Sequence, residues 1–176
     1  MNTLQAVRFL EKQIRNPSLG LPQEIFFFVS RLTPMVNVDL LIKDKKGRTL
    51  LSWRNDRFSG TGWHLPGGII RFKEDISSRI LKVAKEEIGV RVRFDPAPVA
   101  VNQIICSHDT RGHFISILYQ CYLLGEFIPR NQGLTELDPG YLKWHNRAPL
   151  NLIKVHRIYK KYIAQDKSDN KNSVKY

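Results

Sequence analysis

The chain is poor in cysteine and in acidic residues, and it lacks any long apolar stretch. Its two cysteines, Cys106 and Cys121, lie far apart without CxxC spacing, so a disulfide framework or a zinc cluster is not indicated. The apolar run at residues 25–29 is far too short to span a bilayer. Charged residues interrupt residues 3–15, where a signal peptide would need an apolar core. We therefore expect a cytoplasmic protein with reduced thiols and no membrane span.

Acidic residues are outnumbered, with 16 Asp and Glu against 28 Lys and Arg and a net charge of +12. This balance favours an anionic substrate or partner, such as a nucleotide, a nucleic acid or an acidic membrane surface. A solvated basic surface is the alternative. The length of 176 residues and the hydrophobic content of 42% predict one domain with a single core.

Hydrophobic periodicity predicts a domain in which helices and strands are mixed. Helical patterns occupy residues 3–15, 22–31, 75–87 and 152–163. Strand patterns occupy residues 36–42, 49–53, 90–94, 99–107 and 113–124. Polar segments at 54–62 and 131–140 predict loops. The hairpin at 36–53 excludes a purely parallel sheet, so the predicted fold class is α/β with a mixed sheet.

A Gly-Gly turn and a pair of adjacent glutamates flank the predicted helix 75–87. Gly67 and Gly68 precede the helix, and Glu86 and Glu87 lie at its end. Magnesium prefers hard oxygen ligands and shares its coordination shell with phosphate and water. The pattern therefore suits a divalent cation held against a diphosphate, although adjacent glutamates are also common on solvated helix faces.

The spacing around these residues resembles the Nudix box. Gly68 is followed after five residues by Glu74, and after seven more by the segment Lys-Val-Ala-Lys-Glu-Glu-Ile-Gly-Val that starts at Lys82. The resemblance implies a Nudix fold, in which a mixed β-sheet is sandwiched between helices (α/β/α). We expect an N-terminal helical extension at residues 1–32, the Nudix domain at 33–165 and a flexible tail at 166–176.

The resemblance also implies which box residues do the chemistry. Mg²⁺, with Mn²⁺ as the alternative, is expected on Glu86, Glu87 and the backbone carbonyl of Gly67. Glu74 is expected to pair with the residue at position 82 and to brace the helix that carries the two glutamates.

Two box positions depart from the family pattern. Val83 stands where the family has the first of three metal-binding carboxylates. Because an isopropyl group cannot bind a cation, we expect fewer ions than a complete box holds, down to one. Lys82 stands where the family has arginine, and it keeps the charge but loses the bidentate fork, which predicts a looser pairing with Glu74.

From about residue 22 to residue 144 the chain resembles one branch of the family, the GDP-mannose mannosyl hydrolases. The matching residues are Thr33-Pro34-Met35-Val36-Asn37-Val38-Asp39, Gly47 to Leu51, and Arg54 and Arg57 at their spacing to the box. That branch also carries an apolar residue at the position of Val83. The resemblance implies a homodimeric enzyme in which water attacks the sugar carbon of a nucleotide sugar and expels the nucleoside diphosphate.

The same branch assigns roles to residues outside the box. Arg54 would neutralise the leaving diphosphate, and Arg57 would bind it too. Asp39 matches an aspartate that shapes the site, and His113 matches a histidine at the start of a strand. An arginine that follows Gly-Gly in the branch is missing here, and Arg71 is expected to substitute for it.

The late loop departs from the branch more seriously. The branch uses a Gln-His pair there, as metal ligand and general base, whereas residues 135–140 contain no histidine. Glu136 is expected to bind the metal and Asp138 to take the proton, since a positioned carboxylate can do either. A surface-loop role for both is the alternative.

The sequence therefore predicts a magnesium-dependent hydrolase of nucleotide sugars, and two other functions stay open. The first is cleavage of the diphosphate itself, because the late loop offers no histidine base. The second is a degenerate Nudix domain that binds nucleotide or nucleic acid without turnover, which Val83, Lys82 and the net charge motivate. A nucleic-acid site on the basic helix predicted at 152–163 is not favoured, because interleaved aromatic residues are missing there.

Overall fold

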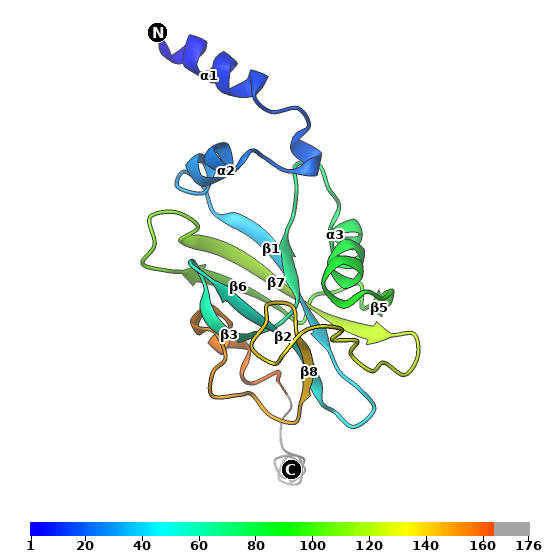
Figure 1. The fold of residues 1–176 in the computed structure, drawn as a ribbon. Helices are drawn as coiled ribbons and strands as arrows, with labels where there is room; N and C mark the ends of the chain where they lie inside the picture. The colour runs from blue at the N-terminus through cyan, green and yellow to red at the C-terminus, as the bar shows by residue number, and fades with distance from the viewer. Residues whose placement is uncertain (164–176) are drawn as a thin grey trace, which may run out of the picture.

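The computed structural model describes residues 1–163, and the tail expected at 166–176 lies outside them. Its strands form two sheets (Figure 1). The larger sheet has the order β4-β1-β7-β5, with β6 paired to β7, and comprises β1 (Met35–Ile42), β4 (Gly67–Ile69), β5 (Val92–Phe94), β6 (Ala100–Ile105) and β7 (His113–Leu123). The smaller sheet has the order β3-β2-β8 and comprises β2 (Thr49–Asp56), β3 (Gly60–His64) and β8 (Leu142–His145).

The larger sheet is mixed, as the sequence predicted, but the hairpin expected at 36–53 does not form one sheet. β1 and β2 belong to different sheets, and the isolated antiparallel bridge between Lys43 and Thr49 joins the two segments. β1 and β7 run parallel, with Met35 opposite Phe114 and Ile42 opposite Cys121. β4, β5 and β6 are antiparallel to their neighbours. Parallel strands need both faces covered, and successive residues of β1 indeed point into two different cores.

The two cores lie on opposite sides of β1. Leu40 packs in one cluster with Ile80 of helix α3 (Ile76–Val83). Leu41 packs in the other with Tyr159 of the 3-10 helix η3 (Lys154–Tyr159). The predicted layering of a mixed sheet between helical layers is therefore confirmed, with a short 3-10 helix in the second layer.

The helix predicted at 75–87 is present and carries its own start and stop signals. Asp75 caps α3 by accepting a hydrogen bond from the Ser78 N–H. α3 continues into a π-helical turn, η2 (Ala84–Ile88), which ends at Gly89 with φ of +81°. Glycine is favoured there because a side chain is strained in this left-handed conformation.

The polar segment 54–62 is not the loop that the sequence predicted. β2 continues to Asp56 and pairs with β3, so that Trp53 lies opposite Trp63 with ring centroids 5.1 Å apart. The Asp56 side chain closes the turn by accepting hydrogen bonds from the N–H groups of Phe58 and Ser59. The prediction was wrong because the polar tip of this hairpin carries no alternating apolar pattern.

The helix predicted at 152–163 is also wrong in extent, since only Lys154–Tyr159 is helical, as a 3-10 helix. The stretch before it is tied to β3. The Trp63 N–H donates to the Asn151 carbonyl, and the Ile153 N–H donates to the Trp63 carbonyl. These bonds hold the backbone extended where the apolar periodicity favoured a helix.

The N-terminal extension contains two helices, α1 (Thr3–Lys12) and α2 (Gln23–Val29), joined by the 3-10 turn η1 (Pro17–Leu19). α1 projects away from the sheets (Figure 1) and has no buried residue. α2 lies closer and buries Ile25. The expected homodimer stays a prediction. None of the helices in residues 1–163 is long and apolar enough to cross a membrane.

Val83 is part of the hydrophobic core, with 2% of its surface exposed. It packs beneath the glycine turn, because a Cβ added at Gly68 would lie only 2.8 Å from Val83 Cγ2. The apolar residue at this box position therefore joins α3 to the turn.

We predict that Val83→Glu destabilises the protein. The new carboxylate would be buried without donors, which costs about 2 kcal/mol or more. Chemical denaturation measures this loss. Lys85→Glu, two residues away and exposed, is the matched control and should stay within about 0.5 kcal/mol of wild type. A Val83→Glu protein as stable as wild type would show that position 83 can reach solvent or a cation.

Candidate active site

The glycine turn and the central strand meet at Asp39. β1 and β4 pair so that Asp39 lies opposite Gly67. A Cβ at position 67 would lie 2.2 Å from Asp39 Oδ1 and 2.8 Å from the Val38 carbonyl oxygen. Only glycine allows this approach, so the backbone of Gly67 is fixed against a buried carboxylate.

Asp39 is 2% exposed and is surrounded by donors from β1, β7 and η3. Its Oδ2 accepts hydrogen bonds from the Tyr159 hydroxyl at 2.8 Å and from Asn37 Nδ2 at 3.1 Å. The Ser116 hydroxyl donates to the same oxygen. Burial and the neighbouring Asp39 raise the pKa of Tyr159, so its hydroxyl remains a donor. These bonds satisfy the buried carboxylate and fix its orientation.

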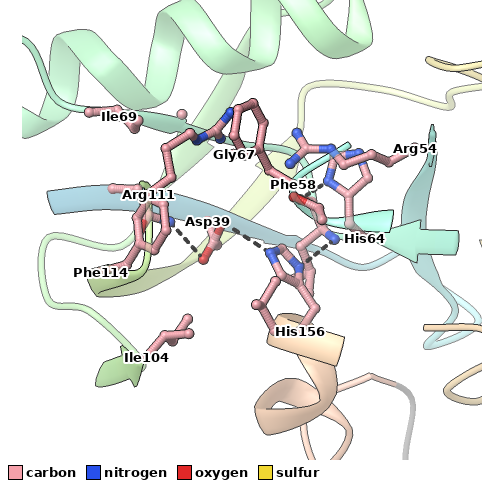
Figure 2. A pocket seen from close by; sticks show the side chains of 15 residues that line it. Asp39, Arg54, Phe58, His64, Gly67, Ile69, Ile104, Arg111, Phe114 and His156 are labelled. Carbon is pink, nitrogen blue, oxygen red and sulfur yellow. Dashed lines mark hydrogen bonds and ion pairs between the residues drawn. The ribbon is translucent and has the colours of Figure 1, made fainter. Parts of the chain in front are cut away.

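Two buried histidines hold the backbone just before the glycine turn. His64 Nδ1 lies 2.7 Å from the Leu65 carbonyl oxygen, and His156 Nδ1 lies 3.1 Å from the Leu65 nitrogen. A carbonyl only accepts, so the His64 proton is on Nδ1; an amide only donates, so the His156 proton is on Nε2. Burial lowers the pKa of both imidazoles, which favours these neutral forms. His156 Nε2 faces Asp39 Oδ1 at 3.9 Å (Figure 2).

Glu87 lies beside the Gly67 backbone, with Arg54, Asp39 and Glu86 as charged neighbours. Burial raises the pKa of Glu87 to about 7, and the two carboxylates add to this rise. Arg54 and a hydrogen bond with the Gly67 backbone oppose it. Both glutamates lie on the π-helical turn, a local widening of the helix that is frequent at functional sites.

The groups around Glu87 fit a divalent cation. Carboxylate and backbone carbonyl oxygens are the hard ligands that Mg²⁺ prefers, with water and phosphate completing its shell. Burial is the main cause of the raised pKa of Glu87, and Asp39 and Glu86 add to it, so a cation beside these carboxylates would favour the ionised form. Within residues 1–163 no cluster of three or more His, Cys, Asp or Glu side chains could hold a metal. Glu87, Glu86 and the Gly67 carbonyl are the groups that could hold a cation here, with water and phosphate as its further ligands.

A pocket opens beside these groups (Figure 2). It is lined by Asn37, Asp39, Arg54, Phe58, Ser59, His64, Leu65, Gly67, Gly68, Ile69, Ile104, Arg111, Phe114, Val155 and His156. Arg54 reaches it from β2, with its Nε 3.5 Å from Asp56 Oδ2. The structure therefore brings together three residues expected from the sequence, Asp39, Arg54 and Gly67.

Arg57 and Arg71 lie in a neighbouring pocket, with Phe26 and Phe27 of α2. The Arg57 guanidinium lies over the Phe58 ring, 4.7 Å from its centroid. Neither arginine lines the first pocket, so the structure separates both of them from Arg54.

Three candidates from outside the box lie elsewhere. His113, at the start of β7, lines neither pocket. Glu136 forms an exposed ion pair with Lys143, with 2.7 Å between the charged atoms. Asp138 accepts hydrogen bonds from the N–H and the hydroxyl of Thr135, within its own loop. The structure does not bring these three side chains to the pocket.

Glu74 is braced by two cations. Lys82 Nζ lies 2.7 Å from Glu74 Oε1, as the box pattern predicts. Arg79, which the sequence did not single out, reaches Oε2 with Nε at 2.8 Å and Nη2 at 2.6 Å. Although burial opposes it, hydrogen bonds from Lys82, the Arg71 backbone and Arg79 lower the pKa of Glu74 to about 2. Lys82 makes one contact, without the fork of an arginine, and the buried guanidinium about one turn earlier on the helix supplies two further bonds.

Several residues that contact Asp39 or line the pocket belong to no sequence motif. Ser116 and Tyr159 lie 77 and 120 residues from Asp39 in the chain. His156 and Arg111 also line the pocket, although both lie far from Asp39 in the sequence. The only available signal was a polar residue inside an otherwise apolar pattern, as with Ser116 within the strand 113–124.

A mixed sheet between helical layers, with an acidic helical turn beside a glycine turn, is the arrangement of a Nudix domain. A model of the NUDIX domain family matches residues 33–165, and the chain belongs to this family.

The similar proteins agree with this assignment. The chain is 25% identical over 115 residues to the low-salt glycan biosynthesis protein Agl8 of Haloferax volcanii, covering 63% of this chain and 73% of that one. A MutT Nudix hydrolase of Burkholderia pseudomallei shares its fold, with a TM-score of 0.58 and 23% identity over 75% of this chain and 99% of that one. The MutT protein of Methanosarcina mazei Go1 has a TM-score of 0.58, with 19% identity over 79% and 98% of the two chains. The two structures confirm the fold.

We predict that Arg79→Ala destabilises the protein far more than Lys82→Ala. Loss of Arg79 leaves Glu74, whose side chain is 5% exposed, with half of its charge partners, and breaking such a buried pair costs about 3–5 kcal/mol. Lys82 is 48% exposed, and pairs of this kind contribute about 0–1 kcal/mol. Urea denaturation of both variants measures the difference. Equal losses would contradict this account, because the exposed Lys82 would then stabilise Glu74 as much as the buried Arg79 does.

Proposed function

We propose that the chain is a magnesium-dependent hydrolase of nucleoside diphosphate sugars, similar to the GDP-mannose mannosyl hydrolases. The observation that carries this proposal is the meeting of Arg54, Gly67 and Asp39 in one pocket, with Glu87 beside it. These groups offer a cation-binding edge and an anion-binding guanidinium to the same ligand, which is what a metal-bound diphosphate needs.

The chemistry is divided among the residues of this site. A bound Mg²⁺ would neutralise charge on the diphosphate oxygens. Glu87, Glu86 and the Gly67 carbonyl would hold that ion. Arg54 binds the diphosphate through charge-assisted hydrogen bonds and stabilises the negative charge that accumulates as the bond to the sugar breaks. Arg79 keeps Glu74, and with it the start of α3, in place.

Two likenesses support a sugar nucleotide as the substrate. The stretch from about residue 22 to residue 144 resembles the mannosyl hydrolase branch, in which the sugar carbon is attacked. The similar protein Agl8 is named for glycan biosynthesis. The first likeness favours release of a nucleoside diphosphate and a free sugar, and the second is in keeping with a sugar-containing substrate.

Cleavage between the two phosphates is the second candidate, and the late loop favours it. Attack at the sugar carbon in the resembled branch uses a histidine base from this loop, which has none here. The carboxylates of Glu136 and Asp138 are bound to Lys143 and Thr135. Attack at phosphorus would give a nucleoside monophosphate and a sugar phosphate instead.

Phosphorus NMR of the protein with magnesium and a panel of GDP-, ADP- and UDP-sugars tests the proposal. We expect release of a nucleoside diphosphate. Monophosphate together with sugar phosphate would establish the second candidate. If no sugar nucleotide of the panel is hydrolysed, the proposal of a nucleotide-sugar hydrolase is contradicted.

The same assay, repeated with two variants, tests whether the reaction takes place at this site. Glu87→Gln removes a ligand charge beside the glycine turn and should lower kcat about 10²–10³-fold, as loss of a stabilising group commonly does. Glu126→Gln, an exposed substitution in the loop after β7, is the matched control and should retain wild-type kcat. Unchanged turnover by Glu87→Gln would place the reaction elsewhere.

A further inference from the structure

Arg111 lies in the turn between β6 and β7, and no motif in the sequence points to it. Its side chain lines the active-site pocket and also the neighbouring pocket formed with α2. Phe58 and Ile69 are the other residues that line both. Arg111 therefore lies where the two pockets adjoin, and Figure 2 shows its side chain in the first of them.

The backbone of Arg111 is held in an uncommon conformation by the N-terminal extension. Its φ is +58°, a left-handed value that few residues other than glycine adopt. The Arg111 N–H donates to Ser30 Oγ at 3.1 Å, and Ser30 is the residue that ends α2. Strain of this kind concentrates at functional sites, where surrounding contacts maintain it.

The guanidinium of Arg111 lies between aromatic rings and lacks a full set of acceptors. Its Cζ is 4.8 Å from the ring centroid of Phe58 and 5.9 Å from that of Phe26 on α2. Its Nε is buried and has no hydrogen-bond partner within residues 1–163. A buried donor without an acceptor costs about 1–3 kcal/mol, so this position favours an acceptor that comes with a ligand.

Two guanidinium groups of the pocket can receive an anionic ligand. Arg54 and Arg111 line the same pocket. Burial and Arg54 lower the pKa of Arg111, while Asp56 opposes them. Asp56 already contacts Arg54 and the turn of its own hairpin. Asp39, a second carboxylate, is bound by its own donors. A diphosphate would give both guanidinium groups the oxygen acceptors that suit their planar forks.

We propose that Arg111 and Arg54 together clamp the diphosphate of the substrate, and that α2 completes this anion site by stacking Phe26 on Arg111. The inference rests on the proposed function, because the anion is the diphosphate of the nucleotide sugar. It gives the N-terminal extension, which lies before the family match at residue 33, a direct part in substrate binding.

Calorimetric titration with inorganic pyrophosphate and with GDP tests this proposal. The titrations are made in EDTA, so that neither metal nor turnover contributes. For Arg111→Ala we expect both affinities to fall about tenfold or more, the loss of about one charge-assisted contact. Arg111→Lys keeps the charge without the fork and should also bind more weakly than wild type. Phe26→Leu should lose about twofold to fivefold, since it removes only the ring beneath the cation.

Arg93→Ala is the matched control, because Arg93 is exposed on β5 and lines neither pocket. It should bind both ligands as wild type does, and thermal unfolding checks that every variant is folded. Arg111→Ala binding as tightly as Arg93→Ala would overturn the proposal. A loss for GDP alone would also overturn it, since Arg111 would then contact the nucleoside.

Failure of the proposed function has a different signature. If no nucleotide sugar is turned over but Arg111→Ala still loses affinity for pyrophosphate, the anion site stands and the hydrolase assignment fails. If nucleotide sugars are hydrolysed and Arg111→Ala keeps its pyrophosphate affinity, the hydrolase stands and the clamp fails.

Discussion

The rest of the structure depends on the buried carboxylate of Asp39. A carboxylate removed from water is costly unless donors surround it. Here the donors come from Tyr159 and Ser116, which are 120 and 77 residues away along the chain. The same carboxylate leaves no room for a side chain at position 67. Satisfying one buried group thus ties η3, β7 and the glycine turn to the central strand.

The backbone of the glycine turn is also fixed by contacts on two sides. On the sheet side, two neutral histidines bind the N–H and the carbonyl of Leu65. On the helix side, Val83 packs beneath Gly68, and Arg79 fixes Glu74 at the start of the helix. A turn supported in this way can keep its backbone beside the acidic residues of the π-helical turn. Burial, together with the nearby carboxylates of Asp39 and Glu86, raises the pKa of Glu87, and a bound cation would oppose this rise.

The parts that could be predicted from the sequence are those encoded over a short distance. The alternation of helices and strands and the extent of the box helix followed from hydrophobic periodicity. The hairpin after Trp53 and the short η3 depend on pairing with Trp63, which local patterns do not show. Arg111 and His156 reach the pocket only through long-range contacts.

Arg79 is an intermediate case. It lies three residues before Lys82, and residues at this spacing share one face of a helix. Helix geometry alone could therefore have indicated that both cations reach Glu74. A lysine at position 82 is therefore tolerated, because the buried guanidinium of Arg79 binds the other carboxylate oxygen of Glu74.

The central claim is that the Gly67 turn and Glu87 form a cation-binding edge facing a diphosphate. A crystal structure with Mn²⁺ and GDP, with manganese located by its anomalous scattering, tests this most directly. The account predicts manganese within coordination distance of the Glu87 carboxylate and the Gly67 carbonyl oxygen, and the diphosphate next to Arg54. Manganese bound instead in the loop at Glu136 and Asp138, with the glycine turn left free, would contradict it.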